Sequence, residues 1–116
     1  SKVFEKLKSE GIKIAILTDT FVTEQKKWEW FKGMNIDQFI DIIICSSVTG
    51  HTKDEKEAYE ITLQKLNLKP EEVVFVGHKK YEMQGTKLAG IKSFSIEKNV
   101  GEDYYIEDIS EILNLI

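Results

Sequence analysis

The chain has 116 residues, of which 41% are hydrophobic and 31% charged, and its formal net charge is −4; these values are typical of one folded domain spanning residues 1–116. All 16 basic residues are lysines, and because arginine makes most bidentate contacts to bases and phosphates, we expect no nucleic-acid partner. No window approaches the ~20 apolar residues of a membrane span, the lysine- and glutamate-rich N-terminus is unlike a signal peptide, and the single Cys45 allows no intramolecular disulfide, so we expect a cytoplasmic protein with no membrane partner.

Helical and apolar segments alternate along the chain. Trp28 and Phe31 lie three residues apart on the buried face of a predicted helix, whereas Trp30 is expected to be half exposed. We expect helices over 2–10, 23–32, 54–66, 81–88 and 108–116, and strands over 12–17, 40–45, 73–76 and 91–96. The predicted helix boundaries are Thr23 as an N-cap, a Thr52 to Glu55 capping box, and Gly11, Gly33 and Gly90 as stops. This alternation predicts an α/β fold, a parallel sheet with helices on both faces.

Three loops follow the predicted strands, at 18–20, 46–53 and 77–82. Ligands of open parallel sheets bind beyond the carboxyl ends of the strands, so these loops are the expected location of a binding site. The rule locates a site without naming a reaction.

The residues of the three loops resemble motifs of the haloacid dehalogenase (HAD) superfamily, whose commonest members are magnesium-dependent phosphatases that pass through an aspartyl-phosphate. Thr18, at the end of IKIAIL, is similar to the hydroxyl of the second motif. Gly50 and Lys53 are similar to the third motif, and VVFVGHKKYEMQG resembles the fourth motif, a strand, Gly-Asp and a second acid. The resemblance implies a three-layer Rossmann-like, HAD-like sheet and a small phosphorylated ligand.

The resemblance also implies roles for individual residues. Lys53 and Thr18 would be catalytic, because an ammonium and a hydroxyl stabilise the charge that develops on a transferring phosphoryl group. Asp19, Thr20 and Gly50 would be substrate-binding residues. Plainer interpretations remain open, in which Lys53 is a solvated lysine at a helix start and Asp19 and Thr20 only form a turn.

The fourth motif departs from the family pattern at His78, which stands where the first aspartate is expected. The family implies Mg²⁺, a cation that prefers oxygen ligands, whereas imidazole suits zinc, copper, nickel or iron. Glu82 matches the second acid, so the metal candidates are Glu82 and His78. A transition-metal site from His51, His78 and Glu82 is an alternative, and two solvated histidines are another.

The first family motif, Asp-x-Asp at the end of the first strand, is absent, and neither IDQFID nor EDYYIED follows a suitable apolar strand. That motif supplies the nucleophile and the general acid or base. The chain is therefore expected to be the C-terminal portion of the family's core, without the usual central first strand and without a cap. The vacant position would leave edges at 12–17 and 73–76 that pair with each other, with an N-terminal fragment or with a second copy.

Two functions follow from these patterns. The first is a HAD-superfamily phosphohydrolase-like domain that is inactive as this chain. The alternative is a non-catalytic binding, regulatory or dimerisation domain with a degenerate HAD fold. An unrelated flavodoxin-like or receiver-like module is less consistent with Gly50 and Lys53.

Overall fold

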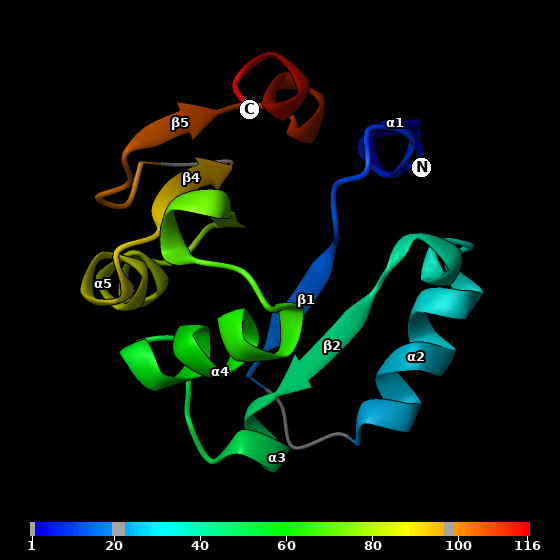
Figure 1. Ribbon diagram of the computed structural model, residues 1–116, viewed down its shortest axis with the longest axis horizontal. Coiled ribbons are helices and arrows are strands. Elements are labelled where there is room, and N and C mark those ends of the chain that lie inside the picture. The colour runs from blue at the N-terminus through cyan, green and yellow to red at the C-terminus, as the bar shows by residue number, and fades with distance from the viewer. Residues whose placement is uncertain (1, 20–22, 97–98) are drawn as a thin grey trace. The chain divides into compact units, whose positions relative to one another are not determined.

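A computed structural model describes residues 2–19, 23–96 and 99–116 (Figure 1). Contacts between Cα atoms divide the chain into two compact units, Ser1–Gly50 and His51–Ile116, and each is described by itself. The expectation of a single domain stays a prediction.

The first unit contains a two-stranded parallel sheet. Its elements are α1 (Lys2–Ser9), β1 (Ala15–Thr18), α2 (Glu24–Gly33), the 3₁₀ turn η1 (Asp37–Phe39), β2 (Ile42–Cys45) and the single-turn α3 (Ser46–Thr49). The ladder runs from Ala15 opposite Ile42 to Thr18 opposite Cys45, so both strands end at the same level. The loops after β1 and β2 therefore leave the same edge of this sheet.

The core of the first unit forms between α2 and β2. Phe31, Ile40, Ile43 and Cys45 are buried together, so Cys45 is a core residue of this unit. Thr23 caps α2 by accepting a hydrogen bond of 3.2 Å from the Lys26 N–H, and Trp30 is 57% exposed; both predictions are confirmed. Helix α2 ends at Gly33, one residue beyond the expected range of 23–32, and the left-handed residue that follows is Asn35, with φ 63°.

The second unit contains a three-stranded parallel sheet in the order β3-β4-β5. Its elements are α4 (Lys56–Leu66), the 3₁₀ turn η2 (Pro70–Glu72), β3 (Val74–Gly77), α5 (Lys80–Ala89), β4 (Lys92–Ile96), β5 (Tyr104–Ile106) and the 3₁₀ helix η3 (Ile109–Asn114). Helix α5 packs on β3 and β4 and also against α4. Buried Tyr59, Met83 and Phe94 are part of the core of this unit.

Strand β5 was not expected from the sequence, which indicated only four strands. Tyr104 and Tyr105 are exposed and only Ile106 is buried, so the segment has no apolar run. Its position is set by tertiary contacts, in which the Tyr104 ring stacks on Phe94 with centroids 5.0 Å apart. The expected helix over 108–116 is instead the 3₁₀ helix η3, which Asp108 caps by accepting from the Ser110 N–H at 2.9 Å.

The α/β prediction with parallel strands is confirmed, and the boundaries of the four expected strands differ from the expected ranges by at most three residues. Among the described strands, β1 is paired only with β2 and β3 only with β4, so the direct pairing of 12–17 with 73–76 is not among the observed ladders. Within residues 2–19, 23–96 and 99–116, no helix is both long and apolar enough to cross a membrane.

Candidate functional site

The predicted residues of the first unit lie at the end of β1 and after α3, the single helical turn that follows β2. Thr18 is the last residue of β1, and both it and Asp19 are half-buried. Gly50 follows α3 in the left-handed conformation, with φ 77°, which explains a glycine there. Thr20 lies outside the described residues.

In the second unit, the structure brings Lys53 and Glu82 together. The Lys53 Nζ atom lies 2.5 Å from Glu82 Oε2, and the two side chains are 15% and 1% exposed. Lys53 belongs to the loop before α4 and Glu82 to the first turn of α5. This buried ion pair joins the residues of the third and fourth motif-like segments.

The second carboxylate oxygen of Glu82 caps the N-terminus of α5. Oε1 accepts hydrogen bonds from the N–H groups of His78 and Lys79, each at 3.0 Å. A Cβ atom at Gly77 would lie 2.5 Å from this oxygen, so only glycine at the end of β3 lets the carboxylate reach its donors. Burial by itself would raise the pKa of Glu82, but the Lys53 ammonium and the two N–H donors outweigh it, so the pKa lies below its ordinary value.

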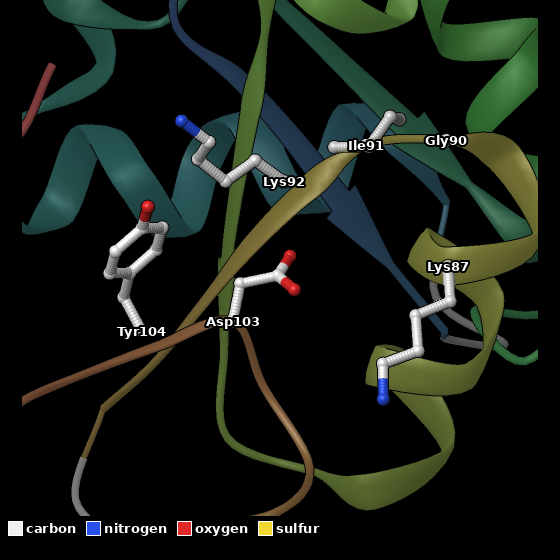
Figure 2. A pocket seen from close by; sticks show the side chains of 6 residues that line it. All are labelled: Lys87, Gly90, Ile91, Lys92, Asp103 and Tyr104. Carbon is white, nitrogen blue, oxygen red and sulfur yellow. The ribbon is translucent and has the colours of Figure 1, made fainter.

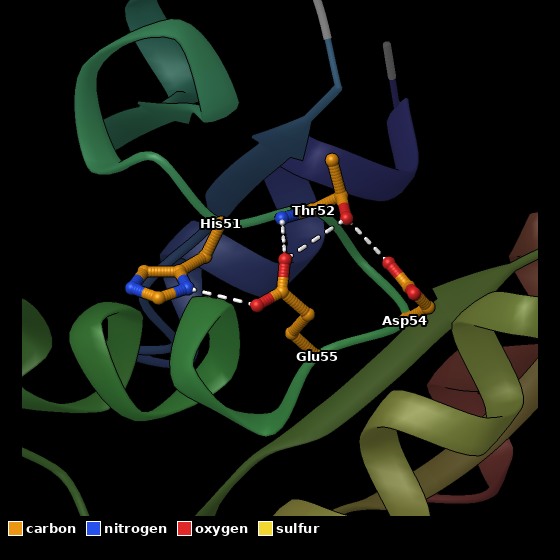
Figure 3. A network of polar contacts seen from close by, with 4 residues as sticks. All are labelled: His51, Thr52, Asp54 and Glu55. Atoms are coloured by element: carbon orange, nitrogen blue, oxygen red, sulfur yellow. Dashed lines mark hydrogen bonds and ion pairs between the residues drawn. The ribbon is translucent and has the colours of Figure 1, made fainter.

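A second polar network holds the loop that carries Lys53 (Figure 3). Glu55 Oε1 accepts from the Thr52 N–H at 3.1 Å, and Glu55 Oε2 lies 3.0 Å from His51 Nδ1. The hydrogen bond to Glu55 raises the pKa of His51, and the same contact lowers the pKa of Glu55. The expected pairing of Thr52 with Glu55 is therefore present, although α4 begins at Lys56 rather than at residue 54.

The residues at the fourth motif do not fit Mg²⁺. Both Glu82 oxygens are already engaged by protein groups: Oε2 pairs with the Lys53 ammonium, and Oε1 accepts two backbone hydrogen bonds. His78 is exposed and offers nitrogen instead of the oxygen that this cation prefers. Magnesium binding by Glu82 and His78 therefore has no support in the arrangement of these side chains.

The alternative metal set of His51, His78 and Glu82 is not gathered either. In the described part of the chain, the one group of three His, Cys, Asp or Glu residues with donor atoms within 4.8 Å of one another is His51, Glu55 and Glu57. Two of these three donors already bond to each other, as described above. This group stabilises the loop and gives no independent sign of a metal.

A shallow hollow lies elsewhere in the second unit (Figure 2). Its lining residues are Lys87, Gly90, Ile91, Lys92, Asp103 and Tyr104. Lys92 and Tyr104 are the first residues of β4 and β5, so the hollow is at the amino ends of these parallel strands. The pair of Lys53 and Glu82 is next to the carboxyl end of β3, which is the edge where ligands of such sheets bind.

Sequence reasoning missed Tyr59, whose hydroxyl contacts the backbone of both Lys53 and Glu82. Its side chain is 2% exposed, and its hydroxyl donates to the Lys53 carbonyl at 2.6 Å and lies 3.1 Å from the Glu82 carbonyl. In the sequence, Tyr59 has only the signal of a core aromatic on α4. The requirement of a buried tyrosine hydroxyl for a partner was the one clue to a further role.

The haloacid dehalogenase-like hydrolase family model matches residues 1–96. A glyceraldehyde 3-phosphate phosphatase of Pyrococcus furiosus is 27% identical over 99% of this chain and 52% of its own length. A pyrophosphatase PpaX of Bacillus mycoides is 26% identical over 97% of this chain and 55% of its own length. The chain therefore spans about half the length of the curated relatives that it matches.

Solved structures have the same fold at low sequence identity. A HAD-superfamily hydrolase from Geobacter sulfurreducens superposes with a TM-score of 0.87 at 19% identity, over 99% of this chain and 57% of that one. At such identity the likeness concerns the fold alone.

Proposed function

The chain belongs to the family of haloacid dehalogenase-like hydrolases, and from that membership we propose that it is the phosphoryl-binding part of a phosphohydrolase-like domain, without hydrolytic activity as this chain. The observation that carries the proposal is the ion pair of 2.5 Å between Lys53 and Glu82 at the carboxyl end of β3, in a sequence without an Asp-x-Asp motif. The pair holds the Lys53 ammonium in place, but the sequence has no Asp-x-Asp carboxylate to attack phosphorus.

Lys53 is the central phosphate-binding residue in this proposal. An ammonium has three N–H donors, and one is directed at Glu82, which prevents the lysine from swinging into solvent. A lysine held in this way stabilises charge on phosphoryl oxygens without reorganising at the moment of binding. By the resemblance to the family pattern, Thr18 would be a further hydroxyl donor, and Asp19, Thr20 and Gly50 would be substrate-binding residues.

The ligand class is a small phosphorylated molecule. Two relatives are named for the hydrolysis of such compounds, glyceraldehyde 3-phosphate and pyrophosphate. The exposed residues His78, Lys79 and Lys80 add basic groups beside the carboxyl end of β3, which favours an anion over a cation at this position. Because the donor set does not fit Mg²⁺, no step of the proposal uses a metal.

The test combines turnover with binding. We expect no phosphate release from p-nitrophenyl phosphate with Mg²⁺, either in the unmodified chain or in His78→Asp, because the substitution restores a metal-type acid but no nucleophile. Inorganic phosphate is expected to shift the amide NMR signals around Lys53, and Lys53→Met is expected to abolish this response. Release by the unmodified chain would overturn the inactivity, and unshifted signals would overturn the phosphate site.

A second candidate function is a non-catalytic binding, regulatory or dimerisation domain. The observation that favours it is that β1 and β3 each have one paired edge among the described strands. Unpaired strand edges recruit other strands, so an N-terminal fragment or a second copy would add at 12–17 or 73–76. Sedimentation velocity from micromolar to millimolar chain concentration tests the second copy, and a constant single-chain mass would overturn self-association.

A further inference from the structure

The hydroxyl of Tyr59 connects the backbones of the two residues that form the ion pair. It donates to the Lys53 carbonyl at 2.6 Å and lies 3.1 Å from the Glu82 carbonyl. Lys53 and Glu82 are 29 positions apart in the chain and belong to different elements. One side chain therefore bridges the loop before α4 and the first turn of α5.

The ring of Tyr59 is packed closely between Phe75 and α5. The Phe75 ring meets it edge-on, with centroids 5.4 Å apart and an interplanar angle of 88°. On α5, a Cβ atom at Gly85 would lie 2.5 Å from Tyr59 Cε2 and would also meet the Lys53 carbonyl oxygen. Only glycine at position 85 therefore allows α5 to approach this ring and the Lys53 loop.

We propose that Tyr59 is a positioning residue that sets where the Lys53 ammonium lies relative to the Glu82 carboxylate. Its relevance to ligand binding rests on the proposed phosphoryl-binding function, but the positioning itself does not. Both side chains of the pair begin from backbone segments bound to the same hydroxyl. Without that hydroxyl, the Lys53 carbonyl loses the hydrogen bond that links it through Tyr59 to the Glu82 carbonyl, and the ammonium samples positions farther from the Glu82 carboxylate.

Two measurable consequences follow. Because the Lys53 ammonium helps to keep the pKa of Glu82 low against the effect of burial, a less well placed ammonium lets that pKa rise. A ligand that binds the ammonium also loses affinity, by roughly fivefold if one hydrogen bond of ordinary net strength is removed.

The experiment compares Tyr59→Phe with Tyr104→Phe. Tyr104 is 45% exposed and lies in the same unit, so its substitution removes a tyrosine hydroxyl away from the pair. The readouts are the titration of the Glu82 side-chain carboxyl by ¹³C NMR, the affinity for inorganic phosphate, and thermal unfolding. We expect a raised Glu82 midpoint and weaker phosphate binding in Tyr59→Phe, and wild-type values in Tyr104→Phe.

A purely structural role for Tyr59 would lower the unfolding temperature in Tyr59→Phe and leave the Glu82 titration at its wild-type midpoint, which would overturn the proposal. If the wild type binds no phosphate, the proposed function fails, while the Glu82 titration still decides whether Tyr59 positions the pair.

A second measurement needs no variant and covers the case in which Tyr59→Phe does not fold. In the wild type, acid titration of Glu82 is expected to shift the Tyr59 ring signals with the same midpoint. Ring signals that do not follow the Glu82 carboxyl would overturn the coupling.

Discussion

The substitution Lys53→Met tests the ion pair at the candidate site most directly. Methionine keeps an unbranched side chain of similar length but removes the ammonium 2.5 Å from Glu82 Oε2. Glu82 is 1% exposed, so water does not readily replace the lost cation. The variant therefore leaves a buried carboxylate that keeps only the N–H donors of His78 and Lys79.

The size of the effect follows from the surroundings of the pair. Removing one partner of a buried ion pair costs about 3–5 kcal/mol, because the other charge remains buried without compensation. Lys53 is 15% exposed and Glu82 retains two backbone hydrogen bonds, which places this case at the lower end. We expect the free energy of unfolding to fall by about 3 kcal/mol at neutral pH.

The loss depends on pH, and its sign follows from the pKa of Glu82. In the wild type this pKa is lowered in the folded state, so the stabilisation is present above the ordinary carboxyl value of about 4.3 and is lost as pH falls through the lowered value. In Lys53→Met, burial is no longer opposed by the ammonium, and Glu82 takes up a proton at a higher pH than in the wild type. The difference between the two proteins is therefore largest at neutral pH and shrinks in acid.

Urea unfolding followed by far-ultraviolet circular dichroism, at neutral pH and near pH 4, measures both effects. The matched control is Lys56→Met, which changes an exposed lysine three residues farther along and is expected to alter stability by at most about 0.5 kcal/mol. A loss at neutral pH below about 1 kcal/mol, or equal losses at the two pH values, would refute a buried and stabilising ion pair.

Three further substitutions test the close packing around Gly85 and the contact between His51 and Glu55. Gly85→Ala is expected to lower the free energy of unfolding by about 2 kcal/mol, because the added Cβ would lie 2.5 Å from Tyr59 Cε2. Gly33→Ala, with no atom within 4 Å of the added Cβ, is expected to stabilise α2 by roughly 0.5–1 kcal/mol; similar effects in thermal unfolding at both positions would contradict the close contact. For His51→Asn, the raised pKa of His51 beside Glu55 means that the pair stabilises below the ordinary histidine pKa and loses this contribution as pH rises through the raised value. The unfolding temperature of His51→Asn is therefore expected to lie below that of the wild type in mild acid and to equal it in mild alkali. A difference that does not change with pH would argue against the ion pair.

Local sequence patterns determined the order and class of most elements. The apolar run at 40–45 contains the whole of β2, because a buried strand needs a continuous apolar segment. The segment 91–96, with its apolar residues Ile91, Phe94 and Ile96, contains the whole of β4. The N-cap Thr23 and the left-handed Gly90 also follow from local backbone chemistry. Strand β5 could not be found in this way, because stacking on Phe94 holds it rather than an apolar run of its own.

At the candidate site, the sequence determined which kinds of residue stand at the strand ends, including His78 at a position where the family resemblance predicts an aspartate. Only the tertiary structure decided how these residues are engaged. In sequence, Glu82 matches the second metal-binding acid of the family pattern, yet its oxygens are bound by Lys53 and by backbone N–H groups. Tyr59 has the sequence signal of an ordinary core aromatic, and its hydroxyl acquires two carbonyl neighbours only when the Lys53 loop and α5 come together. The physical reason is that a motif specifies donors and acceptors along the chain, whereas long-range packing selects the partner that each of them meets.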